Sequence, residues 1–426
     1  MDAGDIFKSD ARSRPKPFSF RPPKRNPLIL WAVKLIIKGE LRRKLKVVDV
    51  EIPDADLERL RSLKGKRCLI LPTHSGGFEP YVIFYLSKLL KDDYNYMAAM
   101  EAFEQKPLLG ALIQRMGVYS IIRGTADRPS LQMTKQLLVD AKRWLVVFPE
   151  GQTVWQNDTV IPFQEGVMQL AFKAYETVAG KDVDASLFCV PIAVKYVYME
   201  NMEAEIDASL ERLESEVFPA DHKIAPERYD RLREIGYAVL TANEAKHGVE
   251  SDEALAFDER IQAMKERVVR AIEEQLDIMP RADATLLDRV RALFNAVDRI
   301  VMEEPEGTPY EQKLARERQQ AMRDLYDDLW RVLQFVAIYG EYVRESITAE
   351  RFLDALCLLE MEVFGERRMW GPRQARVRVG EPIDLKDRAE AYHADKRGTT
   401  HGVTVALESA AREMLTGLAS DSFVRD

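Results

Sequence analysis

The chain has 426 residues, of which 46% are apolar and 31% are charged. This length exceeds what one compact core usually holds, and the composition is that of a folded protein with two or three domains. Lysine and arginine number 62 and aspartate and glutamate 70, so the formal net charge is −8. A general nucleic-acid binder needs a basic surface, and the overall charge excludes that class.

The charge is divided unevenly along the chain. Residues 1–46 hold 13 Lys/Arg and 4 Asp/Glu, a net charge of +9, so the remaining residues carry −17. Residues 1–27 are rich in Pro, Lys and Arg and predict an extended arm. Residues 27–38 predict a helix that begins with proline in its first turn.

This first helix is expected to be amphipathic. Its basic face holds Lys34, Lys38 and Arg42, and its apolar faces include Leu28, Trp31 and Leu35. A basic amphipathic helix with a tryptophan is typical of a segment on an anionic membrane surface, so we expect residues 1–46 to bind one. The alternative is a helix packed on its own domain with its lysines in solvent.

Cysteine and histidine spacing gives no sign of a disulfide framework or a metal site. The three cysteines lie far apart in apolar runs, as reduced core cysteines of a cytosolic protein do, and the five histidines lack metal-ligand spacing. No run approaches the roughly 20 apolar residues that span a bilayer, and the N-terminus does not resemble a secretory signal. These features predict a cytoplasmic protein, peripheral to the inner face of the membrane, with no metal.

Residues 47–200 predict a layered α/β domain with a mixed sheet and flanking helices. Strands are expected at 67–71, 96–99, 119–122, 144–148 and 187–194, and helices at 79–90, 107–115, 129–142 and 166–175. Residues 201–371 are acidic and have helical periodicity. A strand pattern returns at 376–380, so the helical block is predicted to be an all-helical insertion. Residues 372–426 then supply a returning strand of the first domain and a helical tail.

The segment LPTHSGGFEP at 71–80 carries the most informative chemistry. It places His74 on the turn that leaves a buried strand and Glu79 at the start of the next helix. This spacing can bring the carboxylate of Glu79 under Nδ1 of His74, which fixes the tautomer and leaves Nε2 free as a general base. The same spacing also fits an ordinary turn histidine with a glutamate at a helix N-terminus.

Three later segments accompany it in order: GVYSIIRG at 117–124, VFPEG at 147–151 and VPIA at 190–193. With the histidine turn, they resemble the four motif blocks of the PlsC-like glycerolipid acyltransferases, whose third block reads Phe-Pro-Glu-Gly. The segment PFQEGV at 162–167 also resembles a stretch that follows this block in the family. The resemblance covers about residues 47–200 and leaves the helical block outside.

The resemblance implies a role for each matching residue. His74 is the base that deprotonates an acceptor hydroxyl, and Glu79 is its acidic partner. Arg123 holds the acceptor phosphate, although an arginine there also fits a strand-end cap or a pair with a surface acid. Glu150 binds or orients the acceptor hydroxyls. We further infer that the N–H of Gly151 is a candidate donor to the tetrahedral oxyanion.

Two departures from the family pattern bear on the acceptor. Glu79 stands where the family has aspartate, which is one methylene shorter. Residues 152–154 read Gln-Thr-Val where the family usually has Thr-Arg-Ser, so a phosphate-binding cation is missing. Arg123, Lys173 and Lys195 are the candidate replacements.

The sequence therefore predicts an O-acyltransferase of phospholipid synthesis. Its substrates are an acyl-CoA or acyl-carrier-protein thioester and a glycerol-phosphate or lysophosphatidate acceptor, with no cofactor. Two alternatives remain open: the same chemistry on a non-phosphate lysolipid or glycolipid, and a catalytically silent lipid-binding scaffold. The acidic insertion is a poor docking surface for an acidic carrier protein. We therefore expect the insertion to act as a lid or to mediate self-association. No particular oligomeric state is predicted from the sequence.

Overall fold

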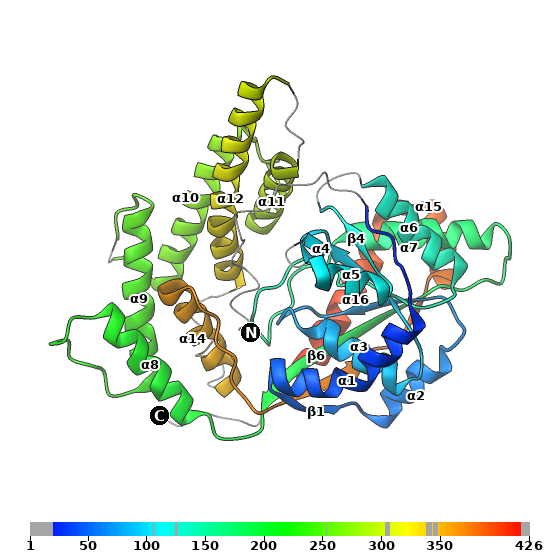
Figure 1. Cartoon of the computed structure of the whole chain (residues 1–426), viewed down its shortest axis with the longest axis horizontal. Helices are drawn as coiled ribbons and strands as arrows, with labels where there is room; N and C mark the ends of the chain where they lie inside the picture. Colours follow the sequence, from blue (N-terminus) through cyan, green and yellow to red (C-terminus); the bar gives the residue numbers. More distant parts are fainter. Residues whose placement is uncertain are drawn as a thin grey trace.

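A computed structural model describes residues 20–104, 107–123, 127–252, 254–302, 307–337, 343 and 348–418. The first 19 residues of the predicted arm, Gly124 of the second motif block and the last eight residues of the tail lie outside this described part. The described chain forms an α/β region with a group of long helices beside it (Figure 1).

One mixed sheet organises the α/β region, as predicted. Its strands are β1 (Val47–Glu51), β2 (Cys68–Pro72), β3 (Asn95–Ala99), β4 (Val118–Ile121), β5 (Leu145–Val146), β6 (Phe188–Tyr198), β7 (Arg373–Val379) and β8 (Ile383–Asp384). The spatial order is β1-β7-β6-β2-β5-β3-β4, and β8 also pairs with β6. The run from β6 to β4 is parallel, whereas β7 and β8 are antiparallel to β6.

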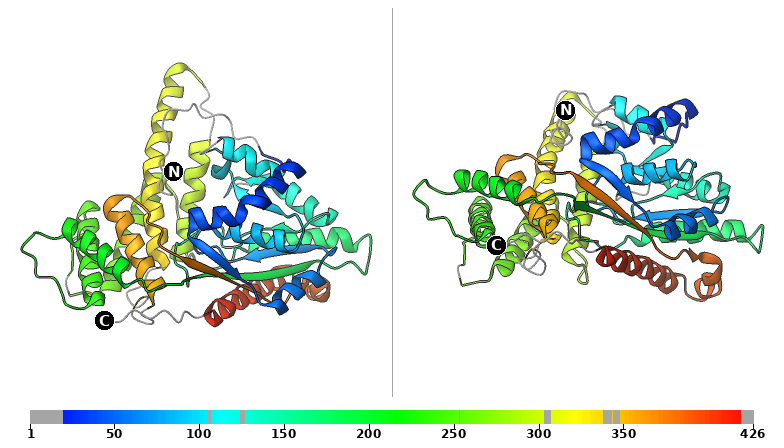
Figure 2. Two further views of the ribbon diagram at one scale, coloured as in Figure 1. Left: turned by 60° about the horizontal axis from the view of Figure 1, so that its bottom comes forward. Right: turned by 90° about the horizontal axis from the view of Figure 1, so that it is seen from below.

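Helices cover both faces of this sheet because its strands are apolar on both sides. Along β2, Ile70 packs into the core under α1 and α3, and Leu69 and Leu71 pack into the core under α7 and α16. Figure 2 shows α16 on the face opposite α1. The bounds are α1 (Pro27–Leu45), α2 (Asp54–Ser62), α3 (Glu79–Leu89), α4 (Glu101–Glu104), α5 (Pro107–Arg115), α6 (Arg128–Asp140), α7 (Glu165–Ala179), η2 (Leu385–Arg388), α15 (Ala389–Ala394) and α16 (Lys396–Gly417).

The helical insertion lies in sequence between β6 and β7, as predicted. Its helices are α8 (Glu203–Val217), α9 (Arg228–Lys246), α10 (Phe257–Leu276), α11 (Leu286–Met302), α12 (Pro309–Ala337) and α14 (Ala349–Phe364). They have two hydrophobic cores, one within α10–α12 and one among α8, α9 and α14. After α14 the chain re-enters the sheet as β7, antiparallel to β6.

Two strand lengths differ from the sequence prediction. β6 continues to Tyr198, four residues past the expected end, because β7 pairs with it along this extension. β5 has only two residues where five were predicted. Its chain turns early, since Pro149 has no N–H to donate and the N–H of Gly151 bonds back to the carbonyl of Phe148.

Helix α1 is longer than predicted and packs on the α/β region. The side chain of Asn26 caps it by accepting from the N–H groups of Leu28 and Ile29. Leu30 and Ile37 are buried against the core. Lys34 forms an ion pair with Asp93 at 2.6 Å. Part of the predicted alternative, a helix packed on its own domain, is therefore correct.

The opposite side of α1 remains open to solvent. Trp31 is 63% exposed and Leu35 57%, and the exposed cations Lys38 and Arg42 continue the same face. Within the described residues, no helix is both long and apolar enough to cross a membrane.

Candidate active site

Three of the motif blocks meet because they follow parallel strands. His74 lies just after β2, Glu150 after β5 and Arg123 after β4. The carboxyl ends of parallel strands face the same edge of a sheet, and side chains placed there share one crevice. This topology brings together segments that are up to 76 residues apart in the chain.

The predicted His74–Glu79 pair is formed. Nδ1 of His74 lies 3.0 Å from Oε2 of Glu79, and Oε1 of Glu79 accepts the N–H of Gly76 at 2.9 Å. Glu79 is fully buried at the start of α3, and the imidazole packs on the ring of Phe148 with centroids 4.3 Å apart. Glutamate thus serves in place of aspartate, since its two oxygens hold both the imidazole and the turn.

The other ring nitrogen of His74, Nε2, points away from Glu79. No described residue hydrogen-bonds Nε2, and the side chain keeps 19% of its surface exposed. Because Nδ1 faces the carboxylate, the proton of a neutral imidazole sits on Nδ1 and Nε2 carries the lone pair. This arrangement leaves Nε2 able to accept a proton.

Glu150 contacts the protein backbone on both of its carboxylate oxygens. Oε1 accepts the N–H of His74 at 2.7 Å, and Oε2 accepts the N–H of Ile161 at 3.0 Å. Burial raises the pKa of Glu150 to about 8 against the opposing effect of these two hydrogen bonds, and the charge of Glu79 adds to the rise. The side chain is fully buried, so an acceptor hydroxyl cannot reach it in this conformation.

Gly151 forms the turn after β5. Its φ is +73°, and a Cβ there would lie 1.9 Å from Nε2 of Gln164. Only glycine fits this position without displacing its neighbour. The N–H of Gly151 donates to the carbonyl of Phe148 at 3.1 Å, so it is engaged within the turn rather than directed at a substrate.

Arg123 is paired with an acid, which is the alternative that the sequence left open. Nη2 donates to Glu101 at 3.1 Å and Nη1 to the carbonyl of Gly151 at 3.4 Å. Burial acts to lower the pKa of Arg123, but the nearby Glu101, Tyr326 and Asp298 outweigh it and raise the pKa. Tyr326 and Asp298 belong to α12 and α11, so the insertion contributes to the surroundings of this arginine.

The other candidate cations do not converge on the histidine. Lys195 is buried and forms an ion pair with Asp158 at 2.7 Å. Lys173 is exposed on α7. Among the described residues, no cluster of three or more His, Cys, Asp or Glu side chains could hold a metal ion.

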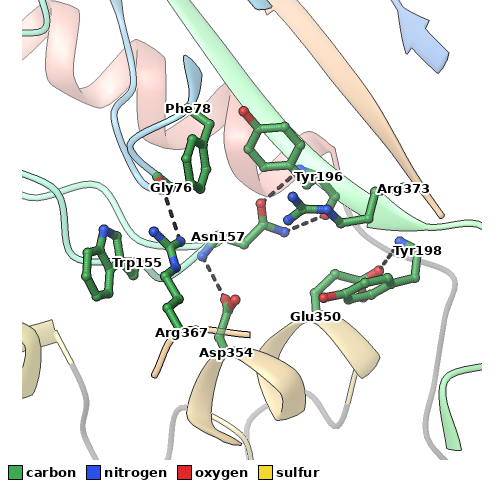
Figure 3. Close-up of a pocket in the computed structure, with 10 residues that line it drawn as sticks. All are labelled: Gly76, Phe78, Trp155, Asn157, Tyr196, Tyr198, Glu350, Asp354, Arg367 and Arg373. Atoms are coloured by element: carbon green, nitrogen blue, oxygen red, sulfur yellow. Dashed lines mark hydrogen bonds between the residues drawn. The ribbon is translucent and has the colours of Figure 1, made fainter. Parts of the chain in front are cut away.

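Two arginines of the insertion and its exit segment contact the motif turns and were not predicted. Arg291 of α11 donates to the carbonyls of Glu150 at 3.1 Å and Pro162 at 2.8 Å. Arg367, just after α14, donates to the carbonyl of Gly76 at 3.3 Å (Figure 3). Arg291 lies 141 residues from Glu150 and 129 from Pro162. Arg367 lies 291 residues from Gly76, so no local sequence pattern marks these contacts.

Comparison with known families agrees with the fold and the motif turns. Residues 51–195 match the family model described as Acyltransferase. The family with this description is that of the PlsC-like glycerolipid acyltransferases, and the match supports a general acyltransferase activity. A comparison with curated proteins gives no match.

Proposed function

We propose that the protein transfers a fatty acyl group from an acyl-CoA or acyl-carrier-protein thioester to the hydroxyl of a glycerol-phosphate or lysophosphatidate acceptor. The observation that carries this proposal is the His74–Glu79 pair, with Nδ1 held at 3.0 Å and Nε2 free of described partners. The family match of residues 51–195 supports the acyl-transfer class.

The chemistry follows from this pair. Nε2 of His74 removes the acceptor's hydroxyl proton as the oxygen attacks the thioester carbonyl, and the buried carboxylate of Glu79 stabilises the resulting imidazolium. The tetrahedral intermediate collapses by breaking the carbon–sulfur bond. The imidazolium returns its proton to the departing thiolate, which leaves as a thiol. An ester has then formed, and the base is regenerated.

Glu150 acts in this proposal as a positioning residue. By accepting the backbone N–H of His74, it fixes the point at which the chain leaves β2. The N–H of Gly151 can serve as an oxyanion donor only after its bond to Phe148 breaks. Arg123 is the phosphate ligand that the family resemblance implies, but it already forms an ion pair with Glu101 in this conformation.

A membrane-surface location of the enzyme is proposed from two neighbouring helices. Helix α1, with its exposed Trp31 and Leu35, contacts α5, whose Leu108 is 89% exposed and Leu109 41%. The chain before α1 is tied to the end of α5, since Asn26 donates its N–H to the carbonyl of Arg115 at 2.8 Å. Exposed apolar side chains beside the cations of α1 suit an anionic lipid surface.

The test is acyl transfer from labelled acyl-CoA and acyl-carrier-protein to a panel of acceptors. The panel contains glycerol 3-phosphate, lysophosphatidate, monoacylglycerol and a lysolipid without a terminal phosphate. Transfer to a phosphate-bearing acceptor is the expected result. No transfer to any acceptor would favour the silent scaffold over an enzyme.

A second candidate function is transfer to a non-phosphate acceptor. It is favoured by the missing cation at residues 152–154 and by the pairing of Arg123 with Glu101. Faster transfer to monoacylglycerol than to lysophosphatidate in the same panel would select it.

A further inference from the structure

The phosphate of the proposed acceptor needs a cation that no carboxylate already neutralises. Arg123 and Lys195 each form an ion pair within the protein. Arg367 forms none with any described residue, although it reaches the turn that carries the histidine. This arginine lies in the segment that connects α14 to β7, outside the family match of residues 51–195.

Aromatic rings hold the guanidinium of Arg367 in place. It lies 4.1 Å from the ring centroid of Trp155 and 4.9 Å from that of Phe78, on either side of the group in Figure 3. Nη2 donates to the carbonyl of Gly76, two residues after His74. Such stacking fixes a planar guanidinium with little further loss of side-chain freedom on binding.

One hydrogen-bond donor of the Arg367 guanidinium also lacks an acceptor. Nε of Arg367 is buried and has no hydrogen-bond partner in the described part of the chain. Burial lowers the pKa of Arg367 against the opposing effect of Cys357, and the positive charge of Arg373 adds to the lowering. Asp354 also acts in the opposite direction, but no described carboxylate forms an ion pair with the guanidinium, so an anion that reached it would gain a charge-assisted hydrogen bond.

Arg367 lines a pocket together with a second arginine, and of the two it is the one better able to bind a ligand (Figure 3). Arg373 also lines the pocket, but its Nε and Nη2 both donate to the carbonyl of Leu45, at 3.2 and 2.7 Å. The two carboxylates in the lining already accept backbone N–H groups. Asp354 accepts from Asn157 and Glu350 from Tyr198, both at 2.8 Å.

We propose that Arg367 binds the phosphate of the acyl acceptor and so replaces the cation that residues 152–154 lack. This inference rests on the proposed acyl transfer, because it names the group that places the acceptor hydroxyl beside His74. Arginine suits the task, since its planar fork can donate two hydrogen bonds to one phosphate. The helical insertion thereby gains a role in acceptor choice, because α14 delivers Arg367 to the motif turn.

The experiment compares Arg367→Gln and Arg367→Lys with the matched control Arg368→Gln, whose side chain is 45% exposed. Loss of hydrogen bonds to a charged group predicts that Arg367→Gln raises KM for lysophosphatidate by about 10- to 100-fold. We expect KM for monoacylglycerol and for the acyl donor to stay within about twofold. Arg367→Lys should recover part of the loss because it keeps the charge, and the control should behave as wild type.

Binding without turnover separates this inference from the proposed function. Glycerol 3-phosphate and inorganic phosphate should each raise the melting temperature of the wild-type protein but not of Arg367→Gln. That pattern would support the anion site even if no acceptor were acylated, in which case only the proposed function fails. Equal KM increases for lysophosphatidate and monoacylglycerol would overturn the inference in favour of a structural role. An increase confined to acyl-CoA would also overturn it, because the phosphate would then belong to the donor.

Discussion

The carboxylate of Glu150 accepts the backbone N–H of His74 at 2.7 Å. A residue of the third motif block, Glu150, therefore fixes the backbone of the first block at His74. Glu79 orients the imidazole ring itself, at 3.0 Å. Two buried carboxyl groups thus act on one histidine, one through its backbone and one through its ring. The position of the proposed base depends on both strands, β2 and β5, rather than on its own turn alone.

Stability should fall as pH rises through the titration of Glu150. Burial raises its pKa to about 8 from the ordinary 4.5, so the folded state keeps a proton that the unfolded chain releases. Between pH 4.5 and 8 the free energy of unfolding should decline, by at most about 1.4 kcal/mol per pH unit from this group. Urea unfolding of wild type and Glu150→Gln at pH 5, 6, 7 and 8 measures the difference in slope.

The control for this comparison is Glu250→Gln, which removes an exposed carboxylate of the insertion. It should retain the wild-type slope. If Glu150→Gln also retained it, Glu150 would not hold a proton in the folded state at neutral pH.

Removing the charge of Glu79 should lower kcat with little change in KM. Glutamine cannot accept from both Nδ1–H of His74 and the N–H of Gly76, and it cannot stabilise an imidazolium as a carboxylate does. We expect Glu79→Gln to lose about 100-fold or more in kcat. Glu79→Asp should be intermediate, because the shorter side chain can reach only one of its two partners. Steady-state kinetics with wild-type activity for Glu79→Gln would contradict the proposed pair.

Alanine at position 151 should destabilise the turn after β5. Its φ of +73° disfavours any Cβ by roughly 1–2 kcal/mol, and the new atom would lie 1.9 Å from Nε2 of Gln164. The matched control is Gly166→Ala in α7, where a Cβ meets nothing within 4 Å. Urea unfolding should show Gly151→Ala to be less stable and Gly166→Ala equal to or more stable than wild type. Equal stability of the two variants would argue against a strained turn.

Membrane binding should depend on the exposed face of α1. Replacing both Trp31 and Leu35 by serine removes two exposed apolar side chains, so co-sedimentation with anionic vesicles should fall about tenfold or more. Met279→Ser is the control, because that side chain is 91% exposed in the insertion. Higher salt should weaken binding, since it screens the cations Lys38 and Arg42. Unchanged binding of the double variant would remove α1 from the membrane contact.

The parts of the fold that were predictable from the sequence have local causes. The apolar run of β2 and the spacing of His74 and Glu79 lie within 12 residues, so strand, turn and helix start were predictable together. The contact of Glu150 with the N–H of His74 was not predictable, because it depends on β2 and β5 being neighbours in the sheet. Arg291 and Arg367 were missed for the same reason: their partners lie far away in the chain, and helix periodicity does not identify them.

The most direct test of the account is acyl transfer by His74→Ala beside His401→Ala. His401 is a matched control because its Nδ1 also contacts a glutamate, Glu165 at 2.8 Å, on the exposed side of α16. With a phosphate-bearing acceptor, His74→Ala should lose about 10²- to 10⁴-fold in kcat while His401→Ala keeps wild-type activity. Turnover by His74→Ala at the wild-type rate would contradict a histidine base in this site.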